Sequence, residues 1–284
     1  MAKTVISASR RTDLPRFHYA WLQQVLKDGE AAVANPRFPE KIYKVDLEPA
    51  NVHSLVLWSK DFSRVLADPG YLNNYNLYFQ YTINLYSRLL EPCVPSYRES
   101  LAVLDGLLKR YCPAQFNIRF DPIIISTRGE LCPTIEQPEA ARLSAFATLC
   151  QDLVTLGMDR CRITTSYLTL YPHVKRGLTE IELDLVPLDT HGQAAFFTRM
   201  AEIGAQYGLS IYTCACPAGG AAVGIELGRC IDGYLLEGLF GGKVSKAKDG
   251  GQRSDCLCHK SIDIGDYKKQ CTGGCEYCYR QNHS

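Results

Sequence analysis

The stretch TVISASRRTDLP, residues 4–15, contains the start of a strand–helix unit. Its first six residues, TVISAS, are rich in β-branched side chains, which is typical of a short strand. Asp13 then precedes Leu14 and Pro15, and an Asp followed by a proline in the first helical turn indicates the start of a helix. Gly29 provides the matching stop signal. A strand followed by a helix is the repeating unit of α/β folds with parallel sheets.

The same alternation continues along the chain. Further strands are predicted where short runs of β-branched and aromatic residues occur, at 53–59, 76–83, 115–122, 162–168 and 209–215. Helical patterns lie at about 95–111, 138–157 and 190–207. This order predicts a parallel sheet with right-handed crossovers. Six strand–helix units are fewer than the eight of a closed barrel, so we expect an α/β fold of the open, partial six-stranded (β/α) barrel type.

Length and charge set limits on the function. The chain has 284 residues, enough for one large α/β domain, and a net charge of +1 from 31 basic and 30 acidic residues. A near-neutral net charge argues against electrostatic binding of nucleic acid over the whole surface. We see no apolar run long enough to span a bilayer and no signal peptide, so we expect a soluble cytoplasmic protein with no membrane partner.

The C-terminal part has a different composition. The segment 239–254 is polar and rich in glycine, which is typical of a bridge between structured parts. We therefore expect a partial barrel over residues 1–238 and a cysteine-rich segment over 239–284. We expect the second to fold over the barrel mouth, so that both form one structural unit.

Thirteen cysteines are many for this length, and their odd number excludes a complete disulfide framework. In a reducing cytosol, clustered cysteines indicate metal binding or redox chemistry. Five are scattered singly and are predicted to be buried small apolar residues: Cys93, Cys112, Cys132, Cys150 and Cys161. The other eight lie in the last quarter of the chain.

Three of those eight stand close together as CTGGCEYC, with the spacing C-x3-C-x2-C: Cys271, Cys275 and Cys278. A structural zinc ion needs four ligands, and Cys258 or His259 can supply the fourth. Alternatively, three thiolates hold a four-iron cluster and leave one iron open for a small molecule. The glycines between the first two cysteines permit the tight backbone that either site requires.

The loop resembles that of the radical S-adenosylmethionine (SAM) enzymes, C-x3-C-x-aromatic-C, with Tyr277 as the aromatic residue. In that superfamily the loop usually follows the first strand of a partial six-stranded barrel, whereas here it is C-terminal. Together with SASRRTD, RFDP, RCID and CLCHKSIDIGDYKKQC, this placement resembles a bacterial family of unknown function with a radical-SAM-like cluster at its C-terminus.

The resemblance implies an enzyme. Cys271, Cys275 and Cys278 would ligate a [4Fe-4S] cluster, its open iron would bind SAM, and Tyr277 would lie near the adenine. Reductive cleavage of SAM would yield a carbon radical, with a 5′-deoxyadenosyl radical favoured over aminocarboxypropyl transfer. The implied partners are a small-molecule substrate and an electron donor such as flavodoxin or ferredoxin.

The remaining cysteines indicate a second metal group. Cys256 and Cys258 form a C-x-C pair just before the loop, and three further cysteines precede it: Cys214, Cys216 and Cys230. They fit an auxiliary iron–sulfur cluster, a zinc ion or a thiophilic substrate, and all three alternatives stay open.

Polar residues at the predicted strand ends are the other candidates, because ligands of parallel α/β sheets bind beyond the carboxyl ends of the strands. Arg10 and Arg11 fit a carboxylate or phosphate of the substrate. For contact with the cofactor, Arg119 and Asp121 share one face of a strand, and Thr165 and Ser166 end the next one: all four are predicted to bind SAM.

Two alternatives to a radical SAM enzyme stay open. The first is a zinc-stabilised α/β binding protein. The second is an iron–sulfur sensor or electron carrier without radical chemistry. Metal content separates the enzyme from the zinc protein, and SAM cleavage separates it from the sensor.

Overall fold

The computed structural model describes residues 3–35, 38, 40–130 and 137–280. The chain forms two compact units, each assembled from three separate stretches. Unit 1 consists of Met1–Thr82, Glu99–Asn117 and Arg229–Thr272, and unit 2 of Ile83–Arg98, Ile118–Gly228 and Gly273–Ser284. The predicted C-terminal segment 239–284 is thus divided between the two units at residue 272.

The sheet of unit 1 has the strand order β10 (Ile262–Asp263), β1 (Thr4–Ala8), β4 (Val52–Ser59) and β5 (Leu77–Thr82). All three pairings are parallel. The β1 strand lies between β4 and β10, because Ser7 pairs with Val56 on one side and with Asp263 on the other. The C-terminal part of the chain therefore adds a strand beside the first one.

The helices of unit 1 are α1 (Leu14–Phe17), α2 (Tyr19–Asp28), α3 (Ser63–Ala67), α8 (Gly233–Phe240) and most of α4 (Tyr97–Leu108), with short 3₁₀ turns at Gly70–Asn74 and Pro113–Gln115. Asp13 caps α1 by accepting the Arg16 N–H at 3.0 Å. Gly29 ends α2 in the left-handed conformation, with φ of 69°. The helix predicted between these two residues is confirmed, but it is broken at His18 into two pieces.

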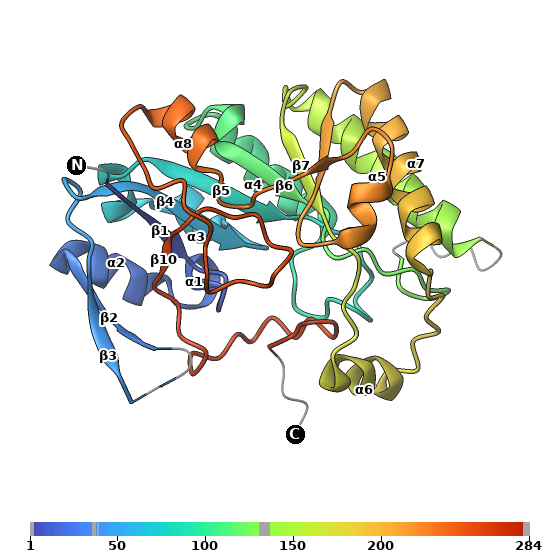
Figure 1. The fold of residues 1–284 in the computed structure, drawn as a ribbon, viewed down its shortest axis with the longest axis horizontal. Coiled ribbons are helices and arrows are strands. Elements are labelled where there is room, and N and C mark those ends of the chain that lie inside the picture. Colours follow the sequence, from blue (N-terminus) through green and yellow to red (C-terminus); the bar gives the residue numbers. More distant parts are fainter. Residues whose placement is uncertain (1–2, 36–37, 39, 131–136, 281–284) are drawn as a thin grey trace. The chain divides into compact units, whose positions relative to one another are not determined.

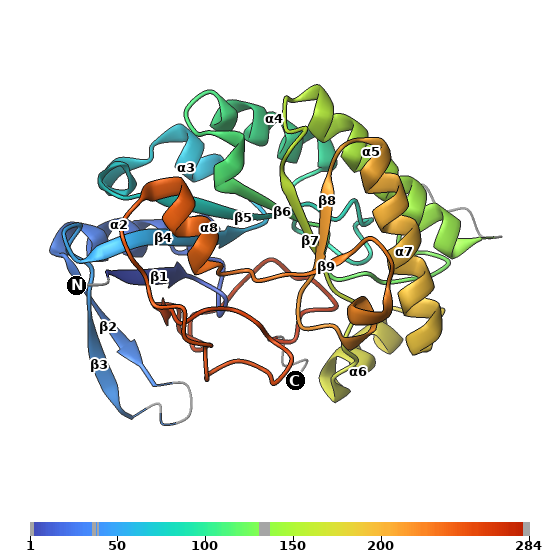
Figure 2. The same ribbon diagram turned by 45° about the horizontal axis from the view of Figure 1, so that its top comes forward.

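An antiparallel hairpin of β2 (Glu30–Ala34) and β3 (Ile42–Asp46) forms a second, two-stranded sheet in unit 1. Figures 1 and 2 show it projecting away from β1 and β4. This hairpin was not predicted. Its β2 strand, EAAVA, is rich in alanine, and that composition does not indicate a strand.

Unit 2 contains β7 (Arg162–Thr165), β8 (Ser210–Thr213), β9 (Glu226–Leu227) and the last residues of β6 (Phe116–Arg119), in the order β6-β7-β8-β9. The β7–β8 and β8–β9 pairings are parallel. Its helices are α5 (Pro138–Thr155), α6 (Pro172–Glu180) and α7 (Thr190–Gln206), with a 3₁₀ turn at Pro217–Ala221. Figures 1 and 2 show α5 and α7 side by side, with α6 apart from both.

The core of unit 2 lies under α5 and α7. The helix predicted at 138–157 is present as α5, and its apolar face is buried, at Leu143, Phe146, Leu149 and Leu153. Burying such side chains contributes about 1.5–3 kcal/mol each. Arg142, on the same helix, is also fully buried.

These elements make an α/β fold with a mostly parallel sheet, as predicted. All six predicted strands are present as β1, β4, β5, β6, β7 and β8. The sheet also contains β9 and β10, of two residues each, which are too short to give a periodic signal. Within the described ranges, no helix combines the length and the apolar character that crossing a membrane requires.

Candidate functional site

Two of the three loop cysteines lie in one turn of unit 2. The Cys278 N–H donates to the Cys275 carbonyl at 3.0 Å, and Gly274 precedes the turn with a left-handed φ of 65°. Cys275 is 9% exposed and packs in an apolar cluster with Tyr86, Leu90 and other residues of unit 2. Cys278 is half-buried at the edge of the same cluster. The turn therefore places one cysteine within an apolar cluster and the other at its edge.

Tyr277, between these cysteines, is buried and hydrogen-bonded at its hydroxyl. The hydroxyl donates to Glu91 Oε1 and accepts from Asn84 Nδ2 at 2.9 Å. Its ring contacts the Tyr86 ring edge-on, with centroids 5.8 Å apart. Burial and the adjacent Glu91 carboxylate raise the pKa of Tyr277 well above its ordinary value, so the phenol stays protonated.

At the carboxyl end of β6, Arg119 and Asp121 form an ion pair with each other, and both side chains are largely buried. Ser166 donates its hydroxyl to the second oxygen of the Asp121 carboxylate. Thr165 donates its hydroxyl to the Phe120 carbonyl at 2.7 Å. The structure thus brings Arg119, Asp121 and Ser166 together, whereas the Thr165 hydroxyl is used to join neighbouring strands.

In unit 1 the carboxyl end of β1 is organised around the Asp263 carboxylate. It accepts four hydrogen bonds, from the hydroxyls of Ser7 and Ser9, each at 2.7 Å, and from the backbone N–H of Arg10 and Gly265, at 2.8 and 2.9 Å. Only 6% of Asp263 is exposed. It fixes β10 against the end of β1.

The predicted anion-binding arginines lie at the same place. Arg10 donates to Asp249 Oδ2 and to Ser261 Oγ, each at 2.9 Å. Arg11 donates to the Gly265 carbonyl at 3.1 Å and lies 3.9 Å from Asp263. Burial acts to lower the pKa of Arg10, but Asp263, Cys258 and Asp249 outweigh it and raise that pKa. Both guanidinium groups thus have partners within the chain, and binding of an external anion stays a prediction.

Three of the predicted auxiliary cysteines are buried in unit 1: Cys230, Cys256 and Cys258. The Ile231 N–H donates to the Cys258 sulfur at 3.5 Å, and the His259 N–H donates to the Ile231 carbonyl at 3.0 Å. The segments that carry Cys230 and Cys258 therefore run side by side. His259 Nδ1 accepts a hydrogen bond from the Gly233 N–H at 2.8 Å, so this ring nitrogen already has a partner within unit 1.

Cys271 also belongs to unit 1 and is half-buried. The residues just before it are held by the β1–α2 region, because Thr12 donates to the Lys269 carbonyl at 3.2 Å and the His18 ring bonds to the Gln270 carbonyl at 2.8 Å. Cys214 and Cys216 follow β8 in unit 2, where the Cys214 N–H donates to the Thr165 carbonyl at 2.9 Å.

The remaining cysteines follow the predictions in part. Cys150 and Cys161 are buried, as expected, but Cys93 and Cys112 are exposed, so the prediction is wrong for these two. Cys132 lies outside the described residues. Over the ranges that the structure describes, no group of three or more His, Cys, Asp or Glu side chains is arranged to hold a metal ion.

Some residues that shape these sites gave no signal in the sequence. Asn84 and Glu91 belong to no motif, yet both are buried beside Tyr277. Arg142 is fully buried because its guanidinium lies between the rings of Tyr86 and Phe120, 3.9 and 3.8 Å from their centroids. It also donates to the Asn84 carbonyl at 2.6 Å. A charged residue on the apolar face of the 138–157 helix was the only available hint.

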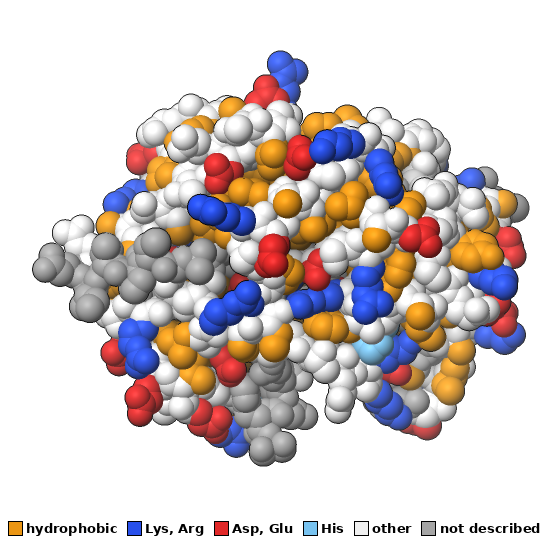
Figure 3. Space-filling model, turned by 180° about the vertical axis from the view of Figure 1, so that it is seen from behind, with side chains coloured by type: hydrophobic (Ala, Val, Ile, Leu, Met, Phe, Trp, Pro, Cys, Tyr) orange, Lys and Arg blue, Asp and Glu red, His pale blue; other side chains and the backbone are white. Residues whose placement is uncertain are grey.

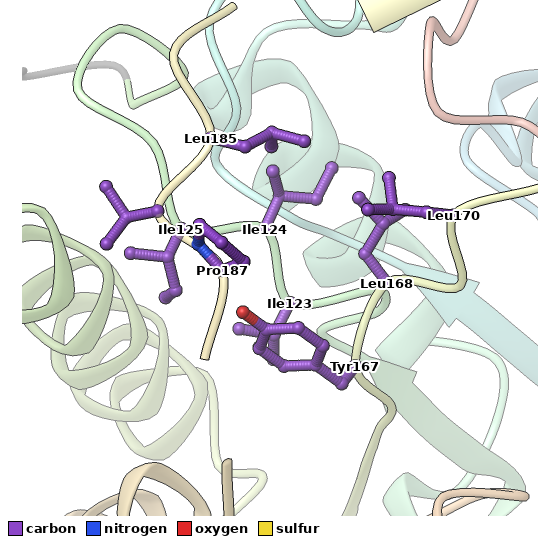
Figure 4. A pocket seen from close by; sticks show the side chains of 9 residues that line it. Ile123, Ile124, Ile125, Tyr167, Leu168, Leu170, Leu185 and Pro187 are labelled. Carbon is purple, nitrogen blue, oxygen red and sulfur yellow. The ribbon is translucent and has the colours of Figure 1, made fainter. Parts of the chain in front are cut away.

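Unit 2 contains a small apolar cavity. Figure 4 shows its lining, which includes Ile123, Ile125, Tyr167 and Pro187. Its volume is about 30 Å³.

The distribution of charged side chains on the surface agrees with the near-neutral net charge of the sequence. On the face shown in Figure 3, the basic and acidic side chains of the described residues are interspersed and form no large patch of one sign. This distribution gives no support for a nucleic-acid surface on that face.

A comparison with protein families matches residues 5–280 to a model described as a domain of unknown function, DUF1848. No curated protein and no solved structure matches the chain.

Proposed function

We propose that this chain, which belongs to the family of domains of unknown function named DUF1848, is a radical SAM enzyme. In this proposal Cys271, Cys275 and Cys278 hold a [4Fe-4S] cluster that binds SAM. The substrate is a small molecule, and an electron donor of the flavodoxin or ferredoxin class supplies the reducing equivalent.

The spacing of the three cysteines, with Tyr277 before the last, carries most weight. The three cysteines supply suitable donor atoms for this cluster, because soft thiolates are the ligands of iron–sulfur clusters. The turn in unit 2 adds support, because Cys275 and Cys278 lie in one turn after a left-handed glycine. When bound, a cluster with one open iron supplies an electron to the sulfonium of SAM.

The chain's own residues would bind SAM and exclude water. Arg119, Asp121 and Ser166 are joined at the carboxyl end of β6, where a ligand of a parallel sheet is expected. We propose that this group contacts the polar parts of SAM. The apolar cluster around Cys275, with Leu90 and Ile124, would keep water away from a radical.

For the fold we propose the partial six-stranded barrel of the radical SAM enzymes. Within unit 1 the strands β1, β4 and β5 follow one another in chain order and are parallel. Within unit 2 the same holds for β7 and β8, which follow β6 in the strand order. Sequential order of parallel strands is the arrangement found in (β/α) barrels.

We further propose that Cys230, Cys256 and Cys258 contribute to a second metal group. All three are buried in unit 1, and the Ile231 N–H points at the Cys258 sulfur. Amide hydrogen bonds to sulfur are a common feature of iron–sulfur sites.

The test is SAM cleavage under anaerobic conditions. The purified protein is reconstituted with iron and sulfide, reduced with dithionite and incubated with SAM, and 5′-deoxyadenosine and methionine are quantified by mass spectrometry. We expect both products from the wild type and from Cys112→Ser, an exposed cysteine outside the loop. We expect neither product above background from Cys275→Ala. Equal product from Cys275→Ala and the wild type would refute the assignment of the loop.

A further inference from the structure

The cysteine turn of unit 2 lies against a second segment of the same unit, residues 90–93. The Glu276 N–H donates to the Leu90 carbonyl at 3.1 Å. A Cβ placed on Gly274 would lie 3.1 Å from Pro92 and 3.9 Å from the Cys93 sulfur. The backbone of the turn is thus in contact with 90–93 both before Cys275 and after it.

A side-chain anchor reinforces this contact. The Tyr277 hydroxyl donates to Glu91 and accepts from Asn84. Asn84 Nδ2 also lies 3.1 Å from Glu91 Oε1, so Glu91 and the Tyr277 hydroxyl share one of its N–H groups and the three polar groups form a closed triangle. Tyr277, Glu91 and Asn84 are 8%, 5% and 2% exposed, so water does not compete effectively with these hydrogen bonds.

The anchor is itself fixed to the rest of unit 2. The Asn84 amide pairs with the Asp121 backbone, donating to its carbonyl at 2.9 Å and accepting its N–H at 2.7 Å. The Asn84 carbonyl accepts from the buried Arg142. Asn84 therefore cannot rotate without breaking several buried hydrogen bonds, and it holds the Tyr277 hydroxyl at a defined place.

From these contacts we propose that Glu91 is a positioning residue. Through the Tyr277 hydroxyl, it holds the Cys275–Cys278 turn in the geometry in which the two thiols bind metal. What the thiols bind rests on the proposed function, whereas the anchoring of the turn does not. Tyr277 was expected to lie near the adenine of SAM. In this proposal its side chain is instead an anchor that packs edge-on against Tyr86.

A carboxylate at position 91 suits this task. It accepts a charge-assisted hydrogen bond from the phenol, which is stronger than a bond between neutral groups. A glutamine keeps an acceptor oxygen of the same reach, so Glu91→Gln should preserve the anchor. A leucine has the size but no acceptor, and it leaves the Tyr277 hydroxyl and the Asn84 amide short of a partner in a buried place.

The first readout uses the protein without metal. The rate at which iodoacetamide alkylates each cysteine is followed by peptide mass spectrometry in the wild type, Glu91→Gln, Glu91→Leu and Tyr277→Phe. We expect alkylation of Cys275 to be about tenfold faster in Glu91→Leu and Tyr277→Phe, because the turn opens locally. Glu91→Gln should remain within about twofold of the wild type.

The buried Cys150 and Cys161 serve as internal references for the fold of unit 2. Their alkylation should stay slow in every variant that remains folded. The matched control is Glu180→Leu, which removes an exposed carboxylate from α6 of the same unit. If Glu91→Leu exposes Cys150 as well, the milder Tyr277→Phe variant, which removes one hydroxyl, decides the question.

The second readout is iron content after anaerobic reconstitution. We expect Glu91→Leu and Tyr277→Phe to retain less than half of the wild-type iron, and Glu91→Gln to restore it. Wild-type protection of Cys275 in both Glu91→Leu and Tyr277→Phe would overturn the inference. If the wild type itself takes up no iron, the proposed function fails, and the alkylation rates still test the anchor.

Discussion

Ser7 and Asp263 are 256 residues apart in the chain, and their side chains form a buried hydrogen bond of 2.7 Å. This bond joins the first strand of unit 1 to its last. Ser9 and the Arg10 backbone bind the same carboxylate, so one side chain fixes β10 to the end of β1. The position of Cys271, which follows β10 in unit 1, therefore depends on Asp263.

Replacing Asp263 should destabilise unit 1. Asp263→Ala leaves the buried hydroxyls of Ser7 and Ser9 without their acceptor and removes a carboxylate that lies 3.8 Å from Arg10 and 3.9 Å from Arg11. We expect a loss of about 3–5 kcal/mol. Urea denaturation followed by circular dichroism measures it. Asp255→Ala, at an exposed position of the same segment, should change the free energy of unfolding by less than about 0.5 kcal/mol. Equal stability of the two variants would show that Asp263 does not fix this segment.

Gly274 should tolerate no side chain. Its φ is 65°, and an added Cβ would crowd Pro92 at 3.1 Å. Gly274→Ala should therefore cost about 1–2 kcal/mol and distort the adjacent cysteine turn. We expect a clear loss of bound iron after reconstitution, measured by metal analysis. Gly250→Ala is the control, because nothing lies within 4 Å of a Cβ there. Iron content equal to that of the wild type in Gly274→Ala would contradict this prediction.

Arg142 should be essential for the stability of unit 2. It is fully buried, bonded to the Asn84 carbonyl and to Glu130 at 3.3 Å, and placed between two aromatic rings. Arg142→Leu leaves the buried Glu130 carboxylate without its cation, which typically costs about 3–5 kcal/mol. The midpoint of thermal unfolding should fall by several degrees, whereas Arg176→Leu on the exposed face of α6 should leave it unchanged. A thermal midpoint in Arg142→Leu equal to that of the wild type would show that this ion pair adds nothing.

Asp13 should make the stability of the protein depend on pH. Burial raises its pKa from 3.8 to about 6, although hydrogen bonds from Ser59, Lys60 and Arg16 oppose the shift. Because the folded protein binds this proton more tightly than the unfolded chain, the contribution favours folding at low pH and is lost as the pH rises through about 6. Asp13→Asn keeps a capping side chain and removes the titration.

The measurement is the free energy of unfolding of the wild type and of Asp13→Asn at pH 5 and pH 7.5. The wild type should lose stability relative to the variant between these two values. A constant difference between the two proteins, or a change in the opposite sense, would show that the pKa of Asp13 is not raised in the folded state.

The sequence predicted the elements whose signals are local. The strands β1, β4 and β5 are runs of β-branched and aromatic residues, and α5 shows its buried face as a repeat of apolar positions. The hairpin of β2 and β3 escaped prediction because its strands are short and largely exposed. Such strands are specified by pairing with each other and not by burial.

Only those residues of the candidate site that belong to a sequence motif could be predicted. The loop cysteines follow from their spacing, and the common face of Arg119 and Asp121 follows from alternation along a strand, whereas their ion pair with each other was not predicted. Glu91 and Tyr277 are 186 residues apart in the chain, and no pattern in the sequence joins them. The pairing of Arg10 with Asp249 is equally remote, which is why an external anion was predicted in its place.

Iron and sulfide analysis combined with an EPR spectrum tests whether Cys271, Cys275 and Cys278 hold a [4Fe-4S] cluster with an open iron. The protein is prepared without oxygen, reduced, and measured with and without SAM. We expect at least about four irons per chain and a four-iron signal that changes when SAM is added. Stoichiometric zinc, no iron after reconstitution and no response to SAM would contradict it.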